Sequence, residues 1–436
     1  MNLLYLNDRR GQYPGSVYAD TRLPFDDQPR IRGELRADIA VVGGGYTGLS
    51  AALHLARRGF QVALLEAHRV GFGASGRNGG QIGSGQRQEV DWLEDNLGRQ
   101  SAARLWSLAE DAKALVRDLA GQAGVPVRYG IAHACRSKDE VDHARALADR
   151  LARDYDYDKV QPLDAEGLSA LIGSPAYIGG DVDWGAAHVH PLNLAIGMAG
   201  LAQGAGARIY ENSHVHRITH AARAGDKSVV HCDTGKVICD HVVLAGNGYL
   251  GNIAPKVSAR VMPINNYIVA TRPLGDDFPE ILPRDTAVAD TKFVVNYWRM
   301  DDQRRLIFGG GETATYKFPK DIRGVVRPHL LSVYPQLRDV ELTHAWGGTL
   351  AITMNRMPYF ARPAQNCLSA SGFSGHGVAM ATLAGRLMAD AVAGQAEGFD
   401  AMAAVPTRLF PGGRFLRAPL LVAGMAWYGL RDRLGI

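Results

Sequence analysis

The hydrophobic pattern predicts two short buried strands near the start of the chain, with a helix between them. Residues 38–43 read Asp-Ile-Ala-Val-Val-Gly, an apolar run typical of a strand that is covered on both faces. Leu49, Leu53 and Ala56 then fall at helical spacing, and a second apolar run over 61–66 ends in a glutamate. The chain therefore opens with a βαβ unit, which indicates a parallel sheet.

Beyond this unit, predicted helices and strands alternate along the chain. Helical spacing covers residues 89–121 and 138–155, and an alanine-rich helix ends near Ala393. A last apolar segment, 418–430, is interrupted by Pro419 and predicts a packed terminal helix. The predicted strands are 215–219, 228–233, 237–245, 262–271, 293–300 and 305–310.

The order of these elements predicts an α/β fold with two interleaved domains. A doubly wound, Rossmann-like nucleotide-binding domain is expected from residues 1–90, 185–250 and 346–436. An α+β substrate domain on a mixed antiparallel sheet is expected from residues 91–184 and 251–345.

Composition excludes several classes of protein. The chain has 436 residues, 46% hydrophobic residues and a formal net charge of +4, so nucleic-acid binding is not expected. Asp8, Arg9 and Arg10 stand where a signal peptide needs its apolar core. No apolar run approaches the roughly 20 residues of a membrane-spanning helix. We therefore expect a cytoplasmic protein with no transmembrane segment.

The four cysteines favour neither a metal site nor a disulfide framework. Cys135, Cys232, Cys239 and Cys367 lack zinc-type spacing, and no metal site is expected. Cys232 and Cys239 flank a predicted turn, so a pairing between them stays open as an alternative to buried free thiols.

The main chemical motif is the glycine-rich turn after the first strand, Gly-Gly-Gly-Tyr-Thr-Gly at 43–48. Its setting between a strand and a helix, with an acidic residue about 20 positions later, is typical of a dinucleotide site. Gly43 allows the tight turn, Gly45 a close approach to a pyrophosphate, and Gly48 close helix packing, while Glu66 suits a ribose diol. A glycine turn without a ligand is the alternative. The residues expected here are Gly43, Gly45, Tyr46, Thr47, Gly48, Glu66 and Ala67.

Two further glycine-rich segments favour FAD over NAD. Residues 71–80 contain small side chains that allow the backbone to approach a ribityl chain, and 372–377 offer another close approach beside a flavin ring. A flavin monooxygenase would need a second fingerprint for NAD(P)H, and none is present. The expected FAD contacts in the first of these segments are Gly73, Ala74, Ser75, Arg77, Asn78, Gly79, Gly80 and Gln81.

The chain resembles the D-amino-acid oxidase/sarcosine oxidase superfamily of FAD-dependent amine oxidoreductases, within it the γ-glutamylputrescine oxidoreductases, nearly end to end. The motifs that carry the resemblance are VVGGGYTGLSAALHLA at 41–56, GFGASGRNGGQ at 71–81, HPLNLAIG at 190–197, LAGNGYLG at 244–251, FSGHGV at 373–378 and FPGGRFLRAP at 410–419.

The resemblance implies a glutathione-reductase type of FAD domain and a non-covalent cofactor. Arg77 stands where some relatives tether FAD through a histidine, and Gly347 and Gly348 lie where others use a cysteine. Ala379 replaces a lysine that holds the substrate carboxylate of sarcosine oxidases, which favours a carboxylate at the far end of the substrate. The further FAD contacts that the resemblance implies are Val215, Ala245, Gly246, Gly375, His376 and Gly377.

The implied function is oxidation of a small amine such as γ-glutamylputrescine, by hydride transfer to flavin N5. The resulting imine would hydrolyse to an aldehyde and ammonia, and O2 or another electron acceptor would reoxidise the cofactor, with H2O2 as the product from O2. The alternatives are a secondary-amine or amino-acid oxidase or dehydrogenase of the same fold, and a non-catalytic flavin-binding protein.

Aromatic side chains are expected to form the wall around the amine, because desolvation lowers its pKa. The candidates are Tyr267, Tyr297, Trp298, Trp346 and Phe373. His190 is a candidate for a hydrogen bond to substrate or flavin, with a structural role as the alternative. Arg299 and Arg356 are candidates for a distal carboxylate, with solvent-facing or phosphate-side positions as the alternative.

Overall fold

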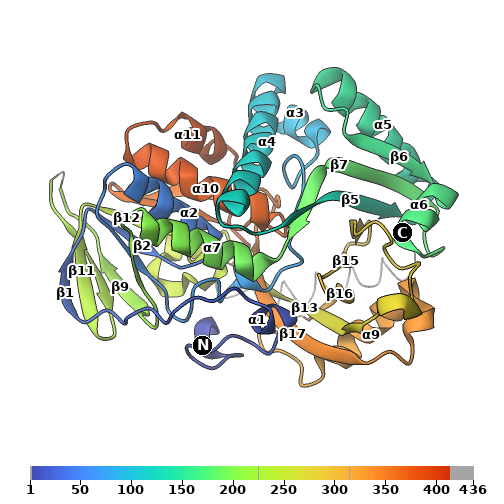
Figure 1. Ribbon diagram of the computed structural model, residues 1–436. Helices are drawn as coiled ribbons and strands as arrows, with labels where there is room; N and C mark the ends of the chain where they lie inside the picture. The colour runs from blue at the N-terminus through green and yellow to red at the C-terminus, as the bar shows by residue number, and fades with distance from the viewer. Residues whose placement is uncertain (1, 224, 314, 413–436) are drawn as a thin grey trace.

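The computed structural model describes residues 2–223, 225–313 and 315–412. Helices pack around a parallel sheet on one side of the molecule and against a larger mixed sheet on the other (Figure 1). The terminal helix predicted over 418–430 and most of the motif at 410–419 lie outside the described residues. Within the described part of the chain, no helix combines the length and apolarity that crossing a membrane requires.

The parallel sheet contains the predicted βαβ unit. Its strand order is β18-β19-β12-β2-β3-β8, and β18 is antiparallel to β19 while the other pairs are parallel. Every residue of β2 and β3 is buried, as their apolar sequences predict. The strands are β2 (Ile39–Val42), β3 (Val62–Leu65), β8 (Arg208–Tyr210), β12 (His241–Leu244), β18 (Tyr359–Ala364) and β19 (Cys367–Ser371).

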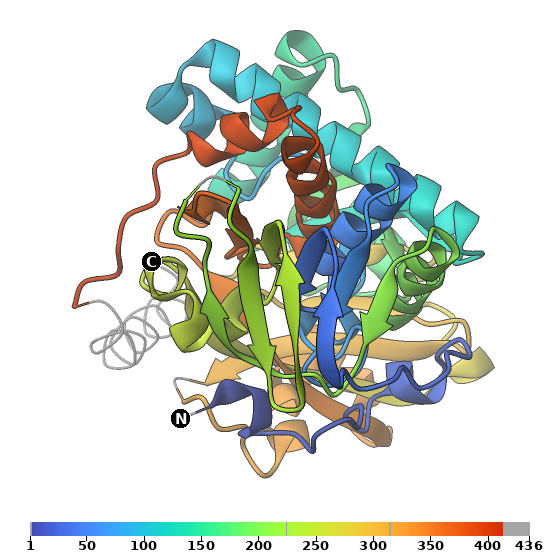
Figure 2. The same cartoon turned by 90° about the vertical axis from the view of Figure 1, so that its left-hand side faces the viewer.

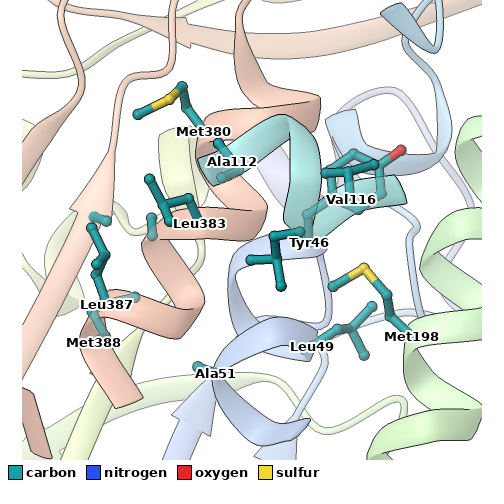
Figure 3. Close-up of a cluster of buried hydrophobic side chains, with 14 of the residues drawn as sticks. Tyr46, Leu49, Ala51, Ala112, Val116, Met198, Met380, Leu383, Leu387 and Met388 are labelled. Atoms are coloured by element: carbon teal, nitrogen blue, oxygen red, sulfur yellow. The ribbon is translucent and has the colours of Figure 1, made fainter. Parts of the chain in front are cut away.

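Four helices bury the largest apolar cluster beside this sheet (Figure 3). Leu49 of α2, Val116 of α4 and Leu383 of α10 meet there. A Cβ atom on Gly385 would lie 2.3 Å from the carbonyl oxygen of Thr47, so only glycine allows α10 to approach α2 this closely. The helices are α2 (Tyr46–Arg57), α4 (Arg99–Gln122), α7 (Pro191–Gly204) and α10 (Gly377–Val392), with α11 (Glu397–Ala403) beside α10.

A separate four-stranded sheet has the order β1-β11-β10-β9, and Figure 2 looks onto the side of the molecule that carries it. The single strand predicted over 237–245 is wrong: it is two strands in two different sheets. The amides of Asp240 and His241 donate to Asp38 O, and the chain passes there from β11 to β12. All four cysteines are buried free thiols, so Cys232 and Cys239 do not pair. The strands are β1 (Gly33–Arg36), β9 (Val215–Thr219), β10 (Ser228–Cys232) and β11 (Gly235–Cys239).

The larger sheet runs β17-β13-β16-β15-β14-β5-β7-β4, and β6 pairs with β7. Two of the expected domain boundaries, 184/185 and 345/346, fall inside β7 and β17, so the division of the chain stays a prediction. The strands are β4 (Gln81–Ile82), β5 (Val127–Cys135), β6 (Val160–Asp164), β7 (Gly179–Val189), β13 (Met262–Pro273), β14 (Ala287–Asp290), β15 (Tyr297–Met300), β16 (Arg305–Thr313) and β17 (Leu342–Ile352).

Two predicted elements of this half have different limits in the structure. The helix predicted over 89–121 is broken at Gly98, whose φ of +80° caps one helix and starts the next. The strand predicted from residue 293 begins at Tyr297, because the preceding residues turn around the Asp290 carboxylate, which accepts the amide of Asn296 at 2.9 Å. The remaining helices are α1 (Val17–Asp20), α3 (Val90–Leu97), α5 (Lys138–Asp154), α6 (Ala165–Ile172), α8 (Pro255–Ser258) and α9 (Ile322–Val333).

Candidate active site

A cavity of about 950 Å³ opens at the carboxyl ends of β2, β3 and β12. Ligands bind at this edge of the sheet in doubly wound folds. Strands β13, β14 and β17 and helix α5 supply the opposite wall, so both sheets contribute to one site. The predicted cofactor residues that line it are Gly43, Gly45, Tyr46, Thr47, Glu66, Ala67, Gly73, Ala74, Ser75, Asn78, Gly79, Gln81, Val215, Ala245, Gly246, Gly375, His376 and Gly377.

The first glycine turn leaves no room for side chains. Gly43 has a φ of +113°, and a Cβ there would lie 2.8 Å from Ala245 O. A Cβ on Gly45 would lie 2.8 Å from Ser75 Oγ, which accepts the amide of Tyr46 at 3.0 Å. Gly48 does not line the cavity; a Cβ there would lie 1.9 Å from Gly43 O, so this glycine serves helix packing. The bare backbone at the start of α2 fits a pyrophosphate group.

Glu66 closes the turn from the second strand. Its Oε2 accepts the amide of Gly44 at 2.6 Å, and its Oε1 accepts the amide of His68 at 2.8 Å. Burial raises the pKa of Glu66 to about 7. Hydroxyl donors of a ribose would stabilise the charged form, and Val215, predicted to lie near adenine, lines the same end of the cavity. This arrangement fits the adenosine half of FAD.

The second glycine-rich loop is held in shape by Asn78. Its Nδ2 donates to the carbonyls of Ala74 at 3.0 Å and Ser75 at 2.9 Å, and its Oδ1 accepts the amide of Gly80 at 2.7 Å. Gly80 itself lies outside the cavity lining, and a Cβ there would meet backbone. The loop therefore presents mainly backbone and small side chains to the cavity.

The side chain of Arg77 points away from the predicted cofactor site. Its Nε donates to Phe72 O at 2.7 Å, and its Nη1 contacts Asp8 at 3.0 Å and Gly347 O at 3.1 Å. Arg77 lines a separate cavity of about 350 Å³ beside the N-terminal arm. The Arg77 side chain was predicted to contact FAD, and this prediction is corrected. The side chain instead links the loop to β17 and to the N-terminal arm.

The third loop, 372–377, reaches the cavity just before α10. Gly375 has a φ of +90°, and His376 contacts Gly85 O through Nε2 at 2.9 Å. A Cβ on Gly83 would lie 2.9 Å from the His376 ring, so the two segments touch. Burial lowers the pKa of His376 to about 4, which makes it neutral at pH 7. These contacts give His376 a positioning function.

Of the predicted aromatic wall, Tyr297 and Phe373 line the cavity. The Tyr297 hydroxyl donates to Asn266 Oδ1, and the ring lies 2.7 Å from where a Cβ of Gly79 would be. A Cβ on Gly309 would lie 2.1 Å from the same ring. Glycines on two elements therefore set the position of this phenol.

The other three predicted aromatic residues are not part of the cavity lining, and their prediction is corrected. Trp298 stacks on Phe308 with ring centroids 5.4 Å apart, on the opposite face of β15 from Tyr297. Trp346 donates to Arg77 O at 3.0 Å. Tyr267 is fully buried and its hydroxyl lies 2.5 Å from Thr313 Oγ1. All three are core residues of the nine-stranded sheet.

His190 and Arg299 also lie outside the cavity lining. His190 caps α7 by accepting the amide of Asn193 at 3.1 Å through Nδ1, and its Nε2 lies 3.0 Å from Thr21 Oγ1. Burial lowers its pKa to about 3. Arg299 donates to Gly79 O at 2.8 Å. Arg299 was predicted as a candidate ligand for a carboxylate. In the structure, its side chain supports the backbone of the loop instead.

One lobe of the cavity, beneath α5, contains residues that the sequence did not single out. Asp183 accepts the hydroxyls of Tyr157 at 2.6 Å and Ser84 at 2.5 Å, and buried Lys113 donates to the same two hydroxyls. Trp106 and other apolar side chains line the lobe beside this network. No sequence motif marks these residues, which come from four separate segments of the chain. Within the described residues, no cluster of His, Cys, Asp or Glu has the composition of a metal site.

The comparisons with known proteins agree with this architecture. Residues 38–391 match the family model described as FAD dependent oxidoreductase. The chain is 37% identical over 432 residues to gamma-glutamylputrescine oxidoreductase of Escherichia coli (strain K12), covering 98% of this chain and 100% of that protein. It is 40% identical over 427 residues to probable oxidoreductase OrdL of Rhizobium meliloti (strain 1021), covering 96% and 98%.

Solved structures show the same fold. The crystal structure of glycine oxidase from Geobacillus kaustophilus matches with a TM-score of 0.69 at 23% identity, over 83% of this chain and 95% of that chain. The fold and the family match define an FAD-dependent oxidoreductase, which confirms the predicted fold class and cofactor. The chain belongs to the FAD dependent oxidoreductase family.

Proposed function

We propose that this enzyme oxidises the C–N bond of a primary amine bearing a γ-glutamyl group, with γ-glutamylputrescine as the expected substrate. The observation that carries the proposal is one continuous cavity, running from the glycine loops past Tyr297 to the lobe beneath α5. The near end suits the cofactor, and the rest leaves space for an extended amine. The named relative that matches over almost its whole length supports the same substrate.

The overall reaction would convert the amine, O2 and water into an aldehyde, ammonia and H2O2. When bound, FAD supplies the acceptor for the two electrons and the hydrogen that leave the carbon next to nitrogen. We propose that it is held by the loops at 43–48, 71–81 and 372–377 and by Glu66. Two residues tied to those loops, Arg299 and His376, keep their backbone in place.

The protein's own contribution is to bind the amine, orient it and exclude water. Tyr297 and Phe373 both line the cavity, and we propose that their rings form the aromatic surface against which the amine binds. An amine held against these rings loses part of its hydration, which lowers its pKa and favours the neutral form that can be oxidised. Asn266 accepts the hydrogen bond of the Tyr297 hydroxyl, which helps to hold the ring at the cavity wall.

Anaerobic mixing of the holoenzyme with a panel of amines tests this proposal. We expect γ-glutamylputrescine to remove the visible absorption of the oxidised cofactor faster than putrescine, sarcosine or free amino acids. Fastest reduction by sarcosine or an amino acid would indicate an amino-acid oxidase instead. No reduction by any amine would indicate a flavin-binding protein. Peroxide measured in air decides between O2 and another acceptor.

A further inference from the structure

Two arginines line the cavity without a carboxylate partner. Arg87 and Arg356 both face it, and neither takes part in any ion pair among the described residues. Acidic side chains of the same walls do have partners: Asp181 lies 2.7 Å from His133, and Glu89 lies 2.8 Å from His143. Glu89 acts on Arg87 only at longer range, so the arginine pair presents positive charge to the cavity without a direct carboxylate partner.

The pair lies where the cavity meets solvent. The guanidinium carbon of Arg356 is 4.6 Å from the centroid of Phe293, which also lines the cavity and is 36% exposed. Arg87 donates through Nε to Ser374 O at 3.1 Å. Burial and, to a lesser extent, the nearby charge of Arg356 lower the pKa of Arg87 to about 10, and the Glu89 carboxylate opposes the shift, so the Arg87 side chain stays charged at pH 7.

Both arginines are mounted on rigid backbone. Asn355 Oδ1 accepts from Thr353 Oγ1 at 3.1 Å and from Met357 N at 3.2 Å, which closes the turn that carries Arg356. Gln88, next to Arg87, donates to the carbonyl of Asn355 at 2.8 Å and joins the two segments. These hydrogen bonds hold the two backbone segments that carry the arginines next to each other.

Arg356 also has an unusual backbone conformation. Its φ is +60°, the left-handed region in which a residue with a Cβ is strained and glycine is favoured. Strain of this kind is found at ligand sites, where the surrounding structure enforces it. A charged side chain at this position is thus a costly choice for a turn that glycine would form more easily.

We infer that Arg87 and Arg356 together bind the carboxylate at the end of the substrate remote from the reacting amine. Guanidinium groups pair with carboxylates through two parallel hydrogen bonds, and two neighbouring cations gain most from an anion shared between them. The inference rests on the proposed function, because a γ-glutamyl amine carries its carboxylate far from the carbon that is oxidised. The pair sets specificity and has no part in the bond-breaking step.

The test compares γ-glutamylputrescine with its α-carboxamide, which keeps the reacting amine and removes the negative charge. In R87M and in R356M, we expect KM for the carboxylate substrate to rise about 10- to 100-fold, with little change in kcat, because each arginine makes a charged hydrogen bond. KM for the carboxamide should change less than about twofold, since that ligand carries no charge for the guanidinium to pair with. R362M is the control, because Arg362 also lies 4.6 Å from a phenylalanine ring, that of Phe399, but it is outside the cavity lining and already pairs with Asp400 at 2.6 Å.

Two readouts separate this role from a structural one. R356G should melt no lower than the wild type, because it relieves the backbone strain, yet it should lose the discrimination between carboxylate and carboxamide. FAD content and the visible spectrum should stay unchanged in R356M and R356G. Loss of FAD or a shifted spectrum in R87M, with discrimination retained, would assign the arginine to the cofactor and overturn the inference.

Failure of the proposed function leaves a different signature. If the wild type oxidises the carboxamide as well as the carboxylate, the arginine pair does not select substrate, while amine oxidation stands. If no amine reacts, glutarate binding to the holoenzyme, followed by thermal shift, tests the pair alone. We then expect a Kd at least about tenfold weaker in R87M and R356M. Equal binding in wild type and variants would refute the inference.

Discussion

The two walls of the cavity differ in composition: one is formed mainly by backbone and small side chains, and the other by long side chains. On the side that we propose holds the cofactor, backbone and small side chains at Gly43, Gly45 and Ser75 form the surface, and a Cβ added at either glycine would collide. On the side that we propose holds the substrate, long side chains line the cavity, such as Tyr297 from β15 and Arg356 from the turn between β17 and β18. The first wall depends on where side chains are missing, and the second depends on which way side chains point.

Neighbouring residues of β15 give the largest expected effect and the sharpest test of this contrast. Trp298→Ala should lower the free energy of unfolding by about 3–5 kcal/mol, because it empties a packed site between Phe308 and Tyr177. Tyr297→Ala, on the cavity face, should lower the rate of anaerobic reduction more than it lowers stability. Urea unfolding and stopped-flow reduction measure the two effects. If the Trp298→Ala variant were stable but its cofactor were reduced slowly by the amine, Trp298 would be assigned to the active site after all.

The same pair shows why the substrate wall was only partly predictable. Tyr297 and Trp298 are both aromatic and adjacent, and alternate positions of a strand face opposite sides. Sequence shows the alternation but not which face meets the cavity, since that depends on the pairing of β15 with β14 and β16. The glycine turns were predictable because a glycine allows close approach of the backbone whichever way the neighbouring strands pair.

Gly48→Ala tests the cofactor wall directly. The new methyl group would lie 1.9 Å from Gly43 O, so the start of α2 must move away from the turn. We expect a loss of about 1–3 kcal/mol in stability and protein purified largely without FAD. Gly200→Ala in α7 is the matched control, because a Cβ there meets nothing within 4 Å and should leave stability equal or slightly higher. Normal FAD content in Gly48→Ala would show that the turn tolerates displacement.

Glu66→Gln tests the acidic residue of the same wall through pH. The pKa of Glu66 is raised from 4.5 to about 7 by burial, so the apoprotein loses stability as pH rises from 4.5 to 7. Between these values the wild type should lose about 1–3 kcal/mol relative to the variant, while the variant should bind FAD about 10- to 100-fold more weakly. Thermal unfolding of both apoproteins at pH 4.5 and pH 8 measures the first effect. If the stability of the wild type and of Glu66→Gln changed equally between pH 4.5 and pH 8, the pKa of Glu66 would not be raised in the folded apoprotein.

Three corrected residues show what pattern alone cannot decide. His190 and Arg77 belong to motifs that carry the resemblance, yet both side chains bind partners within the protein. His190 caps α7, and Arg77 binds Asp8 and the Gly347 carbonyl of β17. Arg299 supports a loop carbonyl. Arg87 was missed because it stands in an irregular segment without a motif. Whether a polar side chain can bind a ligand depends on its hydrogen-bond partners within the protein, and the sequence pattern does not show these partners.

The smallest expected effect concerns the far end of the substrate wall. Ser137 and Glu140 form a capping box at the start of α5, the helix that lines the missed lobe of the cavity. Ser137→Ala removes the acceptor of the Glu140 amide and should cost about 1 kcal/mol of stability. Because α5 is otherwise held by its apolar face, KM for γ-glutamylputrescine should stay within about twofold, and FAD content should not change, since this loss is confined to the first turn. Ser332→Ala, at an exposed hydroxyl of α9 outside the cavity lining, should leave both stability and KM as they are. A larger rise in KM for Ser137→Ala would mean that the position of α5 itself determines how tightly the substrate binds.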